Sequence, residues 1–463
     1  AKVLLSVKNA NIVYDENNGT LLPGFLPGAG NIAVGQSHDF LFFGMDHNAI
    51  GGPAPGWGFV GGSQSDIRLA AVGNGWLSKD PQLNNQYTTT YGTALNLRLT
   101  IEPISKLRVQ LNAKRNYSER HTEFYRWAYS DDIRNYRFET QNVQETGNFS
   151  MSFLSIGTAF QDGRAVFNNF LNNRAAIASG LAQERGLDVS NGVPSGFGLN
   201  SQDVLIKTFM ATYSGTDPSS QNLDRFPSIP MPNWTINYDG LTDIKWVKER
   251  FRSITLGSSY TSVFTMGAFS TNLLFDELTN PYTPGLEDNL DINGNFITEY
   301  NISQVSIVEA FNPLFKIDVT MKNNITTRFE YARDRSLTLS LTNNQILEDI
   351  GTTYTIGMGY RINDFKLLKK SRGKKKTPST LDINADISIR DNASVIRSIE
   401  ENTHQATGGQ RLVSIKTYAD YVINERLSLK IFFDRLLTDY VVSTAVPTTN
   451  TNLGVSLRFT LAQ

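Results

Sequence analysis

The sequence predicts an all-β fold: a wall of about 14 strands belonging to a transmembrane antiparallel β-barrel. Apolar and polar residues alternate in many runs of nine to eleven residues, and this length lets a tilted strand cross a bilayer. The polar face of these runs carries charges as well as hydroxyls, including Arg98, Arg108, Asp318 and Arg328. Only helices and closed barrels satisfy every backbone group in lipid, and no run of 18 apolar residues exists. A soluble all-β protein with long strands is the alternative.

The first two segments differ in character. Residues 1–14 alternate and are expected to form a barrel strand, whereas residues 15–87 are rich in glycine and proline. This second segment is too long for an ordinary connection, so we expect a folded outer loop or cap. Its candidate residues, which would form a rim near the opening, are Pro23, Gly24, Pro55, Gly56, Trp57 and Trp76.

Residues 88–158 return to the two-residue period. Leu95, Leu97 and Leu99 alternate with polar residues, and a second run begins at Leu107. The short turn at residues 102–105 is expected on the periplasmic side, because short turns lie there in such barrels. Residues 129–146 are expected to form an outer loop.

Residues 159–250 are predicted to form a periplasmic insert. Apolar residues between Phe167 and Leu181 follow a helical period, and Gly186 is a suitable C-cap. Three prolines within residues 226–232 argue against a central strand. The insert would narrow or line the periplasmic entrance, or dock a partner. Its candidate partner or gate residues are Pro232, Asn233, Trp234 and Trp246, since large aromatics dominate interfaces.

Residues 251–463 are predicted to complete the wall. Counting back from the last strand gives outer connections at 276–300, Asn323-Asn324, 343–351, 391–410 and 438–451. The same count gives periplasmic turns at Asn312-Pro313, 363–379 and 424–425, with both chain ends on one side. The aromatic residues expected in the interfacial girdles are Tyr354, Tyr360, Tyr421, Phe433 and Phe459.

Sequence motifs for catalysis or for cofactors are weak. Gly56-x-Gly58-x-x-Gly61 lacks the flanking strand and helix of a dinucleotide site, and Asn289-x-Asp291-x-Asn293-Gly294 favours a plain turn over a calcium loop. His38, Asp39, Asp46 and His47 favour loop hydrogen bonding over a metal site. We expect no enzyme activity and no cofactor.

The charge pattern argues against nucleic-acid binding. The formal net charge is −1, which gives no general attraction to polyanions. Residues 366–376 hold seven cations, but the strand count places them in a periplasmic turn. There they are either simply solvated or contact lipid headgroups or an acidic partner.

The chain resembles the C-terminal part of the SprA/Sov family, the giant outer-membrane translocons of the Bacteroidetes type IX secretion system. The segments that carry the resemblance are Lys8-Asn9-Ala10-Asn11-Ile12, Leu22-Pro23-Gly24-Phe25, Ala54-Pro55-Gly56, Gly75-Trp76-Leu77, Asp203-Val204-Leu205-Ile206, Pro232-Asn233-Trp234, Tyr238-Asp239-Gly240-Leu241, Phe311-Asn312-Pro313-Leu314 and Gly359-Tyr360-Arg361-Ile362. The resemblance implies a fragment of a much larger single-chain barrel in the outer membrane. It also implies secreted protein cargo, a smaller barrel partner and a periplasmic plug.

The resemblance and the strand count constrain each other. A barrel of 14 strands has a narrower lumen than the 16–18-stranded porins, which hold only an aqueous channel. Passage of folded cargo would therefore need the rest of the larger barrel. The alternative function is a stand-alone outer-membrane channel for small or hydrophobic solutes. In both cases conduction would be passive.

Overall fold

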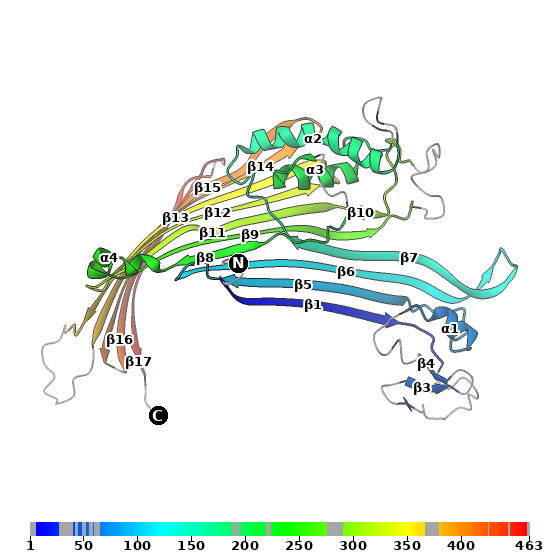
Figure 1. Ribbon diagram of the computed structural model, residues 1–463, viewed down its shortest axis with the longest axis horizontal. Helices are drawn as coiled ribbons and strands as arrows, with labels where there is room; N and C mark the ends of the chain where they lie inside the picture. Colours follow the sequence, from blue (N-terminus) through cyan, green and yellow to red (C-terminus); the bar gives the residue numbers. More distant parts are fainter. Residues whose placement is uncertain are drawn as a thin grey trace.

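A computed structural model (Figure 1) describes residues 6–26, 40–41, 45–48, 52–54, 59, 65–187, 189, 194, 196–218, 224–275, 290–365, 379–424, 426–442 and 445–460. Most of these residues belong to one antiparallel sheet of 14 strands, which confirms the all-β class. Within the described part, no helix is long and apolar enough to cross a membrane.

The sheet follows the order of the sequence. Its main path runs β1-β5-β6-β7-β9-β11-β12-β13-β14-β15-β16-β17, with β8 and β10 paired beside it. The bounds are β1 Val7–Leu21, β5 Tyr87–Ile101, β6 Leu107–Ser130, β7 Asn135–Ser152, β8 Asn233–Tyr238, β9 Phe251–Thr271, β10 Tyr300–Ile302, β11 Gln304–Met321, β12 Ile325–Ser340, β13 Gln345–Asn363, β14 Thr380–Ser398, β15 Thr403–Asn424, β16 Leu427–Tyr440 and β17 Thr448–Phe459.

The remaining elements are short strands and helices. Strands β2 (Phe40–Leu41), β3 (Met45–Asn48) and β4 (Gly52–Ala54) form a separate small sheet. The helices are α1 (Arg68–Gly73), α2 (Gly163–Glu184), α3 (Gln202–Ser214), α4 (Lys245–Arg250) and the 3-10 helix η5 (Gly240–Asp243).

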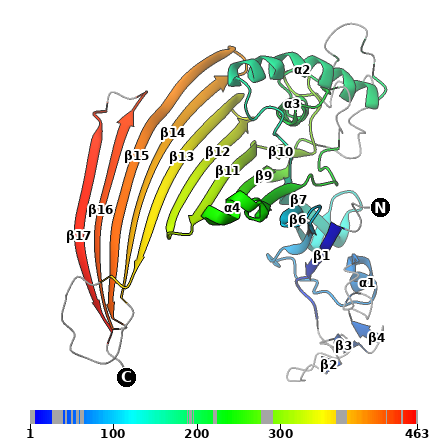
Figure 2. The ribbon, with the colours of Figure 1, turned by 60° about the vertical axis from the view of Figure 1, so that its left-hand side comes forward.

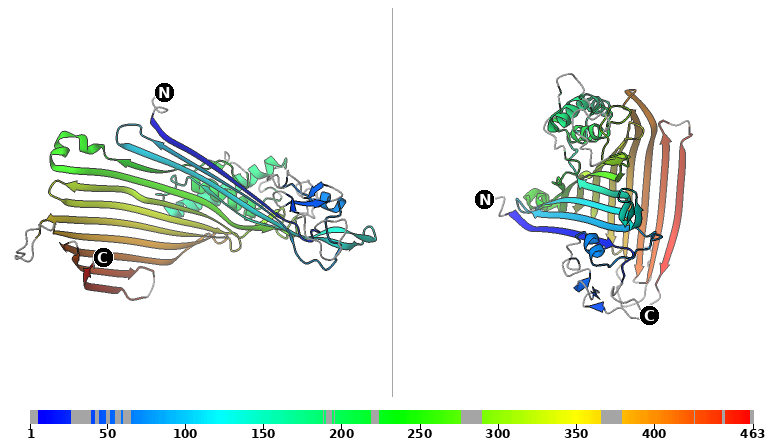
Figure 3. Two further views of the ribbon diagram at one scale, coloured as in Figure 1. Left: turned by 90° about the horizontal axis from the view of Figure 1, so that it is seen from below. Right: turned by 90° about the vertical axis from the view of Figure 1, so that its right-hand side faces the viewer.

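The large sheet is curved and open. Strands β1 and β17 lie at the two ends of the strand order, and the described residues do not pair them with each other. Figure 2 shows these strands at opposite margins of the curved sheet, and Figure 3 shows the same margins from two further directions. The described residues therefore form an open sheet, and not a closed barrel.

The strands are longer than the sequence predicts. The predicted outer loops 129–146, 343–351 and 391–410 are replaced by tight turns at 131–134, 341–344 and 399–402. β1 likewise continues to Leu21, inside the segment predicted as a cap. Beyond the bilayer-length runs, charges such as Glu348, Asp391 and Arg397 interrupt the apolar phase of the strands, so the alternation is weaker although the backbone pairing continues.

One predicted turn is wrong, and another is present but lies at the other end of the sheet. β11 passes through Asn312-Pro313, where only a register shift interrupts its pairing with β12 and β9. β12 is likewise one strand from Ile325 to Ser340. The Asn323-Asn324 turn therefore lies at the same end of the sheet as Asn363 and Thr380, and not at the opposite end. We call this end the short-turn end, and the end with turns 341–344 and 399–402 the insert end.

β7 and β8 share one position in the sheet. β7 pairs with β6 and β9 over their insert-end halves, and β8 pairs with the same two strands over their short-turn halves. Residues 153–232 leave the sheet between them. β8 begins at Asn233, directly after the proline-rich stretch. A strand of the sheet therefore lies inside the segment 159–250, which was predicted to be an insert.

Helices α2 and α3 form the compact part of this insert. Asp162 caps α2 by accepting a hydrogen bond from the Ala165 backbone N–H at 3.3 Å, and α3 ends at Gly215 with a φ of 73°. Both helices bury aromatic residues, including Phe167, Phe170 and Phe209, against the sheet. The predicted helix over residues 167–181 is confirmed.

Candidate functional site: a two-faced wall with a docked insert

One face of the sheet carries a continuous apolar row. Residues directly opposite each other on neighbouring strands point to the same face. Register pairs one row across six strands, formed by Leu256, Ile317, Phe329, Ile356, Ile387 and Ile415. Apolar pairs also occur on the same face at both margins of the sheet. There Ile12 lies opposite Leu97, and Ile431 lies opposite Val455. We call this band, in the short-turn half of the sheet, the apolar belt.

The belt is exposed and has the height of a bilayer core. Ile356, Met358 and Leu453 expose 60%, 59% and 71% of their surface. On β13 the belt runs over nine residues, Tyr354 to Ile362, which span about 30 Å along the strand. A tilt of about 40° reduces this to about 23 Å, close to the ~25 Å apolar band of outer-membrane barrels. An exposed apolar surface this large marks a membrane or an interaction surface.

The predicted girdle residues occupy different environments. Tyr354 and Tyr360 are exposed on the belt face, and Tyr354 stacks on Tyr331 with ring centroids 4.8 Å apart. Phe459 is exposed and Phe433 is partly buried. Tyr421 is instead buried, because its ring packs against Phe365 and its hydroxyl donates to the Phe365 carbonyl at 3.3 Å.

The opposite face of the sheet is polar, and several of its charges are paired. Arg361 contacts Asp382 at 2.5 Å from the directly opposite position, and Arg328 contacts Asp318 at 3.2 Å. Lys316 also reaches Asp318, at 2.8 Å. Such a surface is hydrated and offers no large apolar patch to a passing molecule.

Charges mark the boundary of the belt on its own face. One step beyond Tyr331 and Tyr354, the directly opposite residues are Arg333, Thr352, Asp391, Arg411 and Asp439. Arg411 and Asp391 form an ion pair at 2.6 Å. A bilayer core would end at this row, because unburied charges are costly in lipid. The strands continue beyond it toward the insert end.

The insert docks on the belt face, beyond this row. Its core includes Phe149, Met266, Ile307 and Leu339, which have the same strand phase as the belt residues. Residues Ile346 and Ile399 extend the contact to the insert end. The insert therefore covers the apolar face near the predicted outer connections. The prediction that it lines the periplasmic entrance is corrected, because the apolar phase of the strands draws the helices to this face.

Buried ion pairs hold the insert to the sheet. Arg335 on β12 contacts Glu309 on β11 at 2.9 Å, and both are nearly inaccessible. Arg335 also donates to the carbonyl and hydroxyl of Thr158, each at 3.0 Å, while Glu309 accepts from Ser155 at 2.7 Å. A second buried pair, Glu348 with Arg397, lies beside Gly163 at the start of α2. These groups pair with one another where water is excluded, and only Arg335 Nε among them is buried without a hydrogen-bond partner in the described residues.

Lys207 is the insert's buried cation. It lies on α3, and its ammonium donates to the Asp224 carbonyl. Burial lowers the pKa of Lys207 to about 8. The charged form therefore costs the docked insert free energy near neutral pH.

The predicted partner residues Asn233 and Trp234 lie in the break between β7 and β8. Ser152 accepts a hydrogen bond from the Lys114 N–H at 3.0 Å, and Asn233 accepts from the Ser262 N–H at 2.8 Å. These side chains replace backbone acceptors where the sheet is interrupted. Trp234 stacks on Tyr260 at 4.4 Å. Asn233 and Trp234 thus belong to the sheet, and Pro232 immediately precedes β8.

The other predicted candidates are spread over both ends. Trp246 on α4 is 63% exposed at the short-turn end. Trp76 is buried at the insert end with Ala71 and Leu77, against Tyr125 and Phe138 of the strands. Pro23 is buried and Gly24 has a φ of 74°, which favours glycine. The candidates Pro55, Gly56 and Trp57 lie outside the described residues.

The structure bears on two of the motifs that the sequence analysis weighed. Asp291 accepts hydrogen bonds from the backbone N–H groups of Asn293 and Asn295, each at 2.8 Å, which is the predicted plain turn. No cluster of metal-binding side chains occurs in the described residues. The cation run 366–376 and the glycine motif 56–61 lie outside them.

Comparison of the sequence with models of protein families gives no match, and comparison with curated proteins gives no significant match.

Sequence reasoning missed Ser152, Glu309, Arg335, Glu348 and Arg397. The sequence does contain a signal for the four charged residues among them. Each occupies the apolar phase of an alternating strand, as Glu309 does after Val305 and Ile307. A charge in that phase indicates a covered position or a membrane boundary.

Proposed function

We propose that this sheet is one section of the wall of an outer-membrane conduit that passively passes folded secreted proteins. The observation that carries the proposal is the separation of the two faces. One face has an exposed apolar belt, and the other is polar, with ion pairs at several positions along the same strands. A membrane-spanning wall between lipid and water needs this arrangement.

The open edges support a wide conduit. β1 and β17 have no mutual pairing in the described structure. Unpaired edges are not tolerated in lipid, so further strands would have to complete the wall. The resemblance to the type IX translocons supplies the cargo class, which is folded secreted protein. It also supplies a smaller barrel and a periplasmic plug as proposed partners.

The first experiment is the denatured mass of the native polypeptide in its source membrane. A mass several-fold above 51.6 kDa is expected for a segment of a giant barrel, with loss of protein export when the gene is disrupted. A mass near 51.6 kDa with normal export would contradict the proposal. A stand-alone channel for small or hydrophobic solutes would then replace it.

A further inference from the structure

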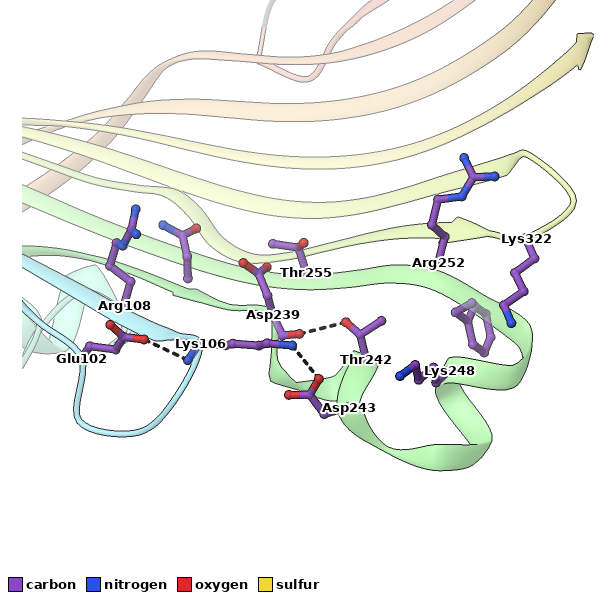
Figure 4. A pocket seen from close by; sticks show the side chains of 12 residues that line it. Glu102, Lys106, Arg108, Asp239, Thr242, Asp243, Lys248, Arg252, Thr255 and Lys322 are labelled. Carbon is purple, nitrogen blue, oxygen red and sulfur yellow. Dashed lines mark hydrogen bonds and ion pairs between the residues drawn. The ribbon is translucent and has the colours of Figure 1, made fainter.

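A cavity of about 1030 Å³ opens at the short-turn end, on the polar face. It lies between β6, the η5–α4 segment, β9 and the turn that joins β11 to β12 (Figure 4). Arg108 and Thr255 belong to the polar phase of their strands, since they lie opposite Asn237 and Asp318. The cavity is therefore on the face that we propose lines the conduit, at the end opposite the insert.

The cations around this cavity outnumber the available acids. Asp243 is engaged by Lys106 at 2.5 Å, and Glu102 by Lys8 at 3.4 Å. Four other cations line the cavity without a carboxylate of the described residues within ion-pair distance: Arg108, Lys248, Arg252 and Lys322. Asp239 is the one lining acid without a described ion pair. The cavity thus has an excess of positive charge.

The cations are spread out and do not converge on one point. Arg108 comes from β6, Lys248 from α4, Arg252 from β9 and Lys322 from the turn after β11. Figure 4 shows Arg108 at one side of the cavity and Lys322 at the other. A single phosphate is held by donors that converge on it, whereas carboxylates along an extended chain match separated cations.

We propose that this cavity binds an acidic segment of a polypeptide at the short-turn end of the conduit. The inference rests on the proposed function, which makes the polar face the side that proteins meet. The separated cations would pair with successive Asp or Glu side chains, with Lys106 and Asp243 already paired at the border. The interaction would be weak, steered by charge and sensitive to salt.

The test measures binding of fluorescent peptides to the purified protein in detergent. A hexaglutamate peptide is the probe, a hexalysine peptide is the charge control, and inorganic phosphate is a competitor. The test variant is Arg108→Gln/Lys322→Gln. The matched control is Arg120→Gln/Lys416→Gln, which removes two charges from the same polar face away from the cavity.

Binding of the acidic peptide is expected, with a roughly five- to tenfold loss in the test variant, no loss in the control variant, and weakening by salt. Equal losses in both variants, or inhibition by phosphate at concentrations where chloride of equal ionic strength has no effect, would overturn the proposal. Absence of peptide binding with a giant denatured mass would reject only this site. Peptide binding with a mass near 51.6 kDa would reject only the conduit.

Discussion

Individual charged residues at positions where the strand alternation calls for apolar residues determine where the insert docks. Glu309 and Arg335 lie directly opposite each other and face the belt side, yet they are among the most buried residues. Ser155, Thr158 and Tyr260 offset the cost of burying this pair by hydrogen bonding to its charged groups. The pair specifies the docking position, although an apolar pair of equal volume could be as stable.

Glu309→Gln is expected to weaken insert docking by about 3–5 kcal/mol, because Arg335 would keep a buried charge without a partner. Hydrogen exchange of α2 and α3 measures the loss, with β14–β17 as the internal reference. Glu309→Met/Arg335→Met removes both charges and is expected to restore most of the protection. Protection unchanged in the single variant would contradict the role of the pair.

Lys207 is expected to make insert stability depend on pH. Its pKa falls to about 8 on folding from its ordinary value of 10.5, so the unfolded segment binds more protons between these values. Stability therefore rises as the pH increases from about 8 to 10.5, by up to about 3 kcal/mol. Urea unfolding of the helical signal at several pH values measures this rise. Lys207→Met should abolish it, and a rise that persists in that variant would assign it to another group.

At the scale of elements, the break between β7 and β8 depends on two side chains. Asn233→Ala removes the acceptor of the Ser262 N–H and is expected to cost about 1–3 kcal/mol. Thermal unfolding measures the cost, and Asn237→Ala on the same strand is the control, because Asn237 faces the cavity and not the break. Equal effects of the two substitutions would mean that the break needs no side-chain acceptor.

The sequence predicts the belt halves of the strands better than their extensions. Runs such as Leu95–Ile101 keep strict alternation, because one face is apolar and the other is polar. Past Arg333 and Asp391 the apolar phase is interrupted by Arg335 and Arg397, yet the pairing continues to Ser340 and Ser398. The helix in the insert was predictable from its apolar period. Its position was not, since docking on the belt face depends on the register of six strands.

For the whole molecule, the belt predicts that adjacent residues of one strand differ sharply in their accessibility to lipid-soluble and to charged reagents. The chain has no cysteine, so Ile356→Cys or Thr355→Cys introduces its single thiol. In the native membrane, Cys at 356 should react with a lipid-soluble maleimide and resist a charged one. Cys at 355, one step along β13 and on the polar face, should show the reverse preference. Equal labelling of both positions by the charged reagent would exclude a lipid-facing belt.

The break between β7 and β8 also sets the order in which the wall can be built. The chain leaves the sheet at Ser152 and returns at Asn233, and a packed wall does not let a folded helix pair thread through it afterwards. The insert must therefore already lie on the belt face when β8 closes the gap. With the belt in lipid, the exposed surface of the insert meets molecules that diffuse laterally in the membrane plane. Cargo inside the lumen would never touch it.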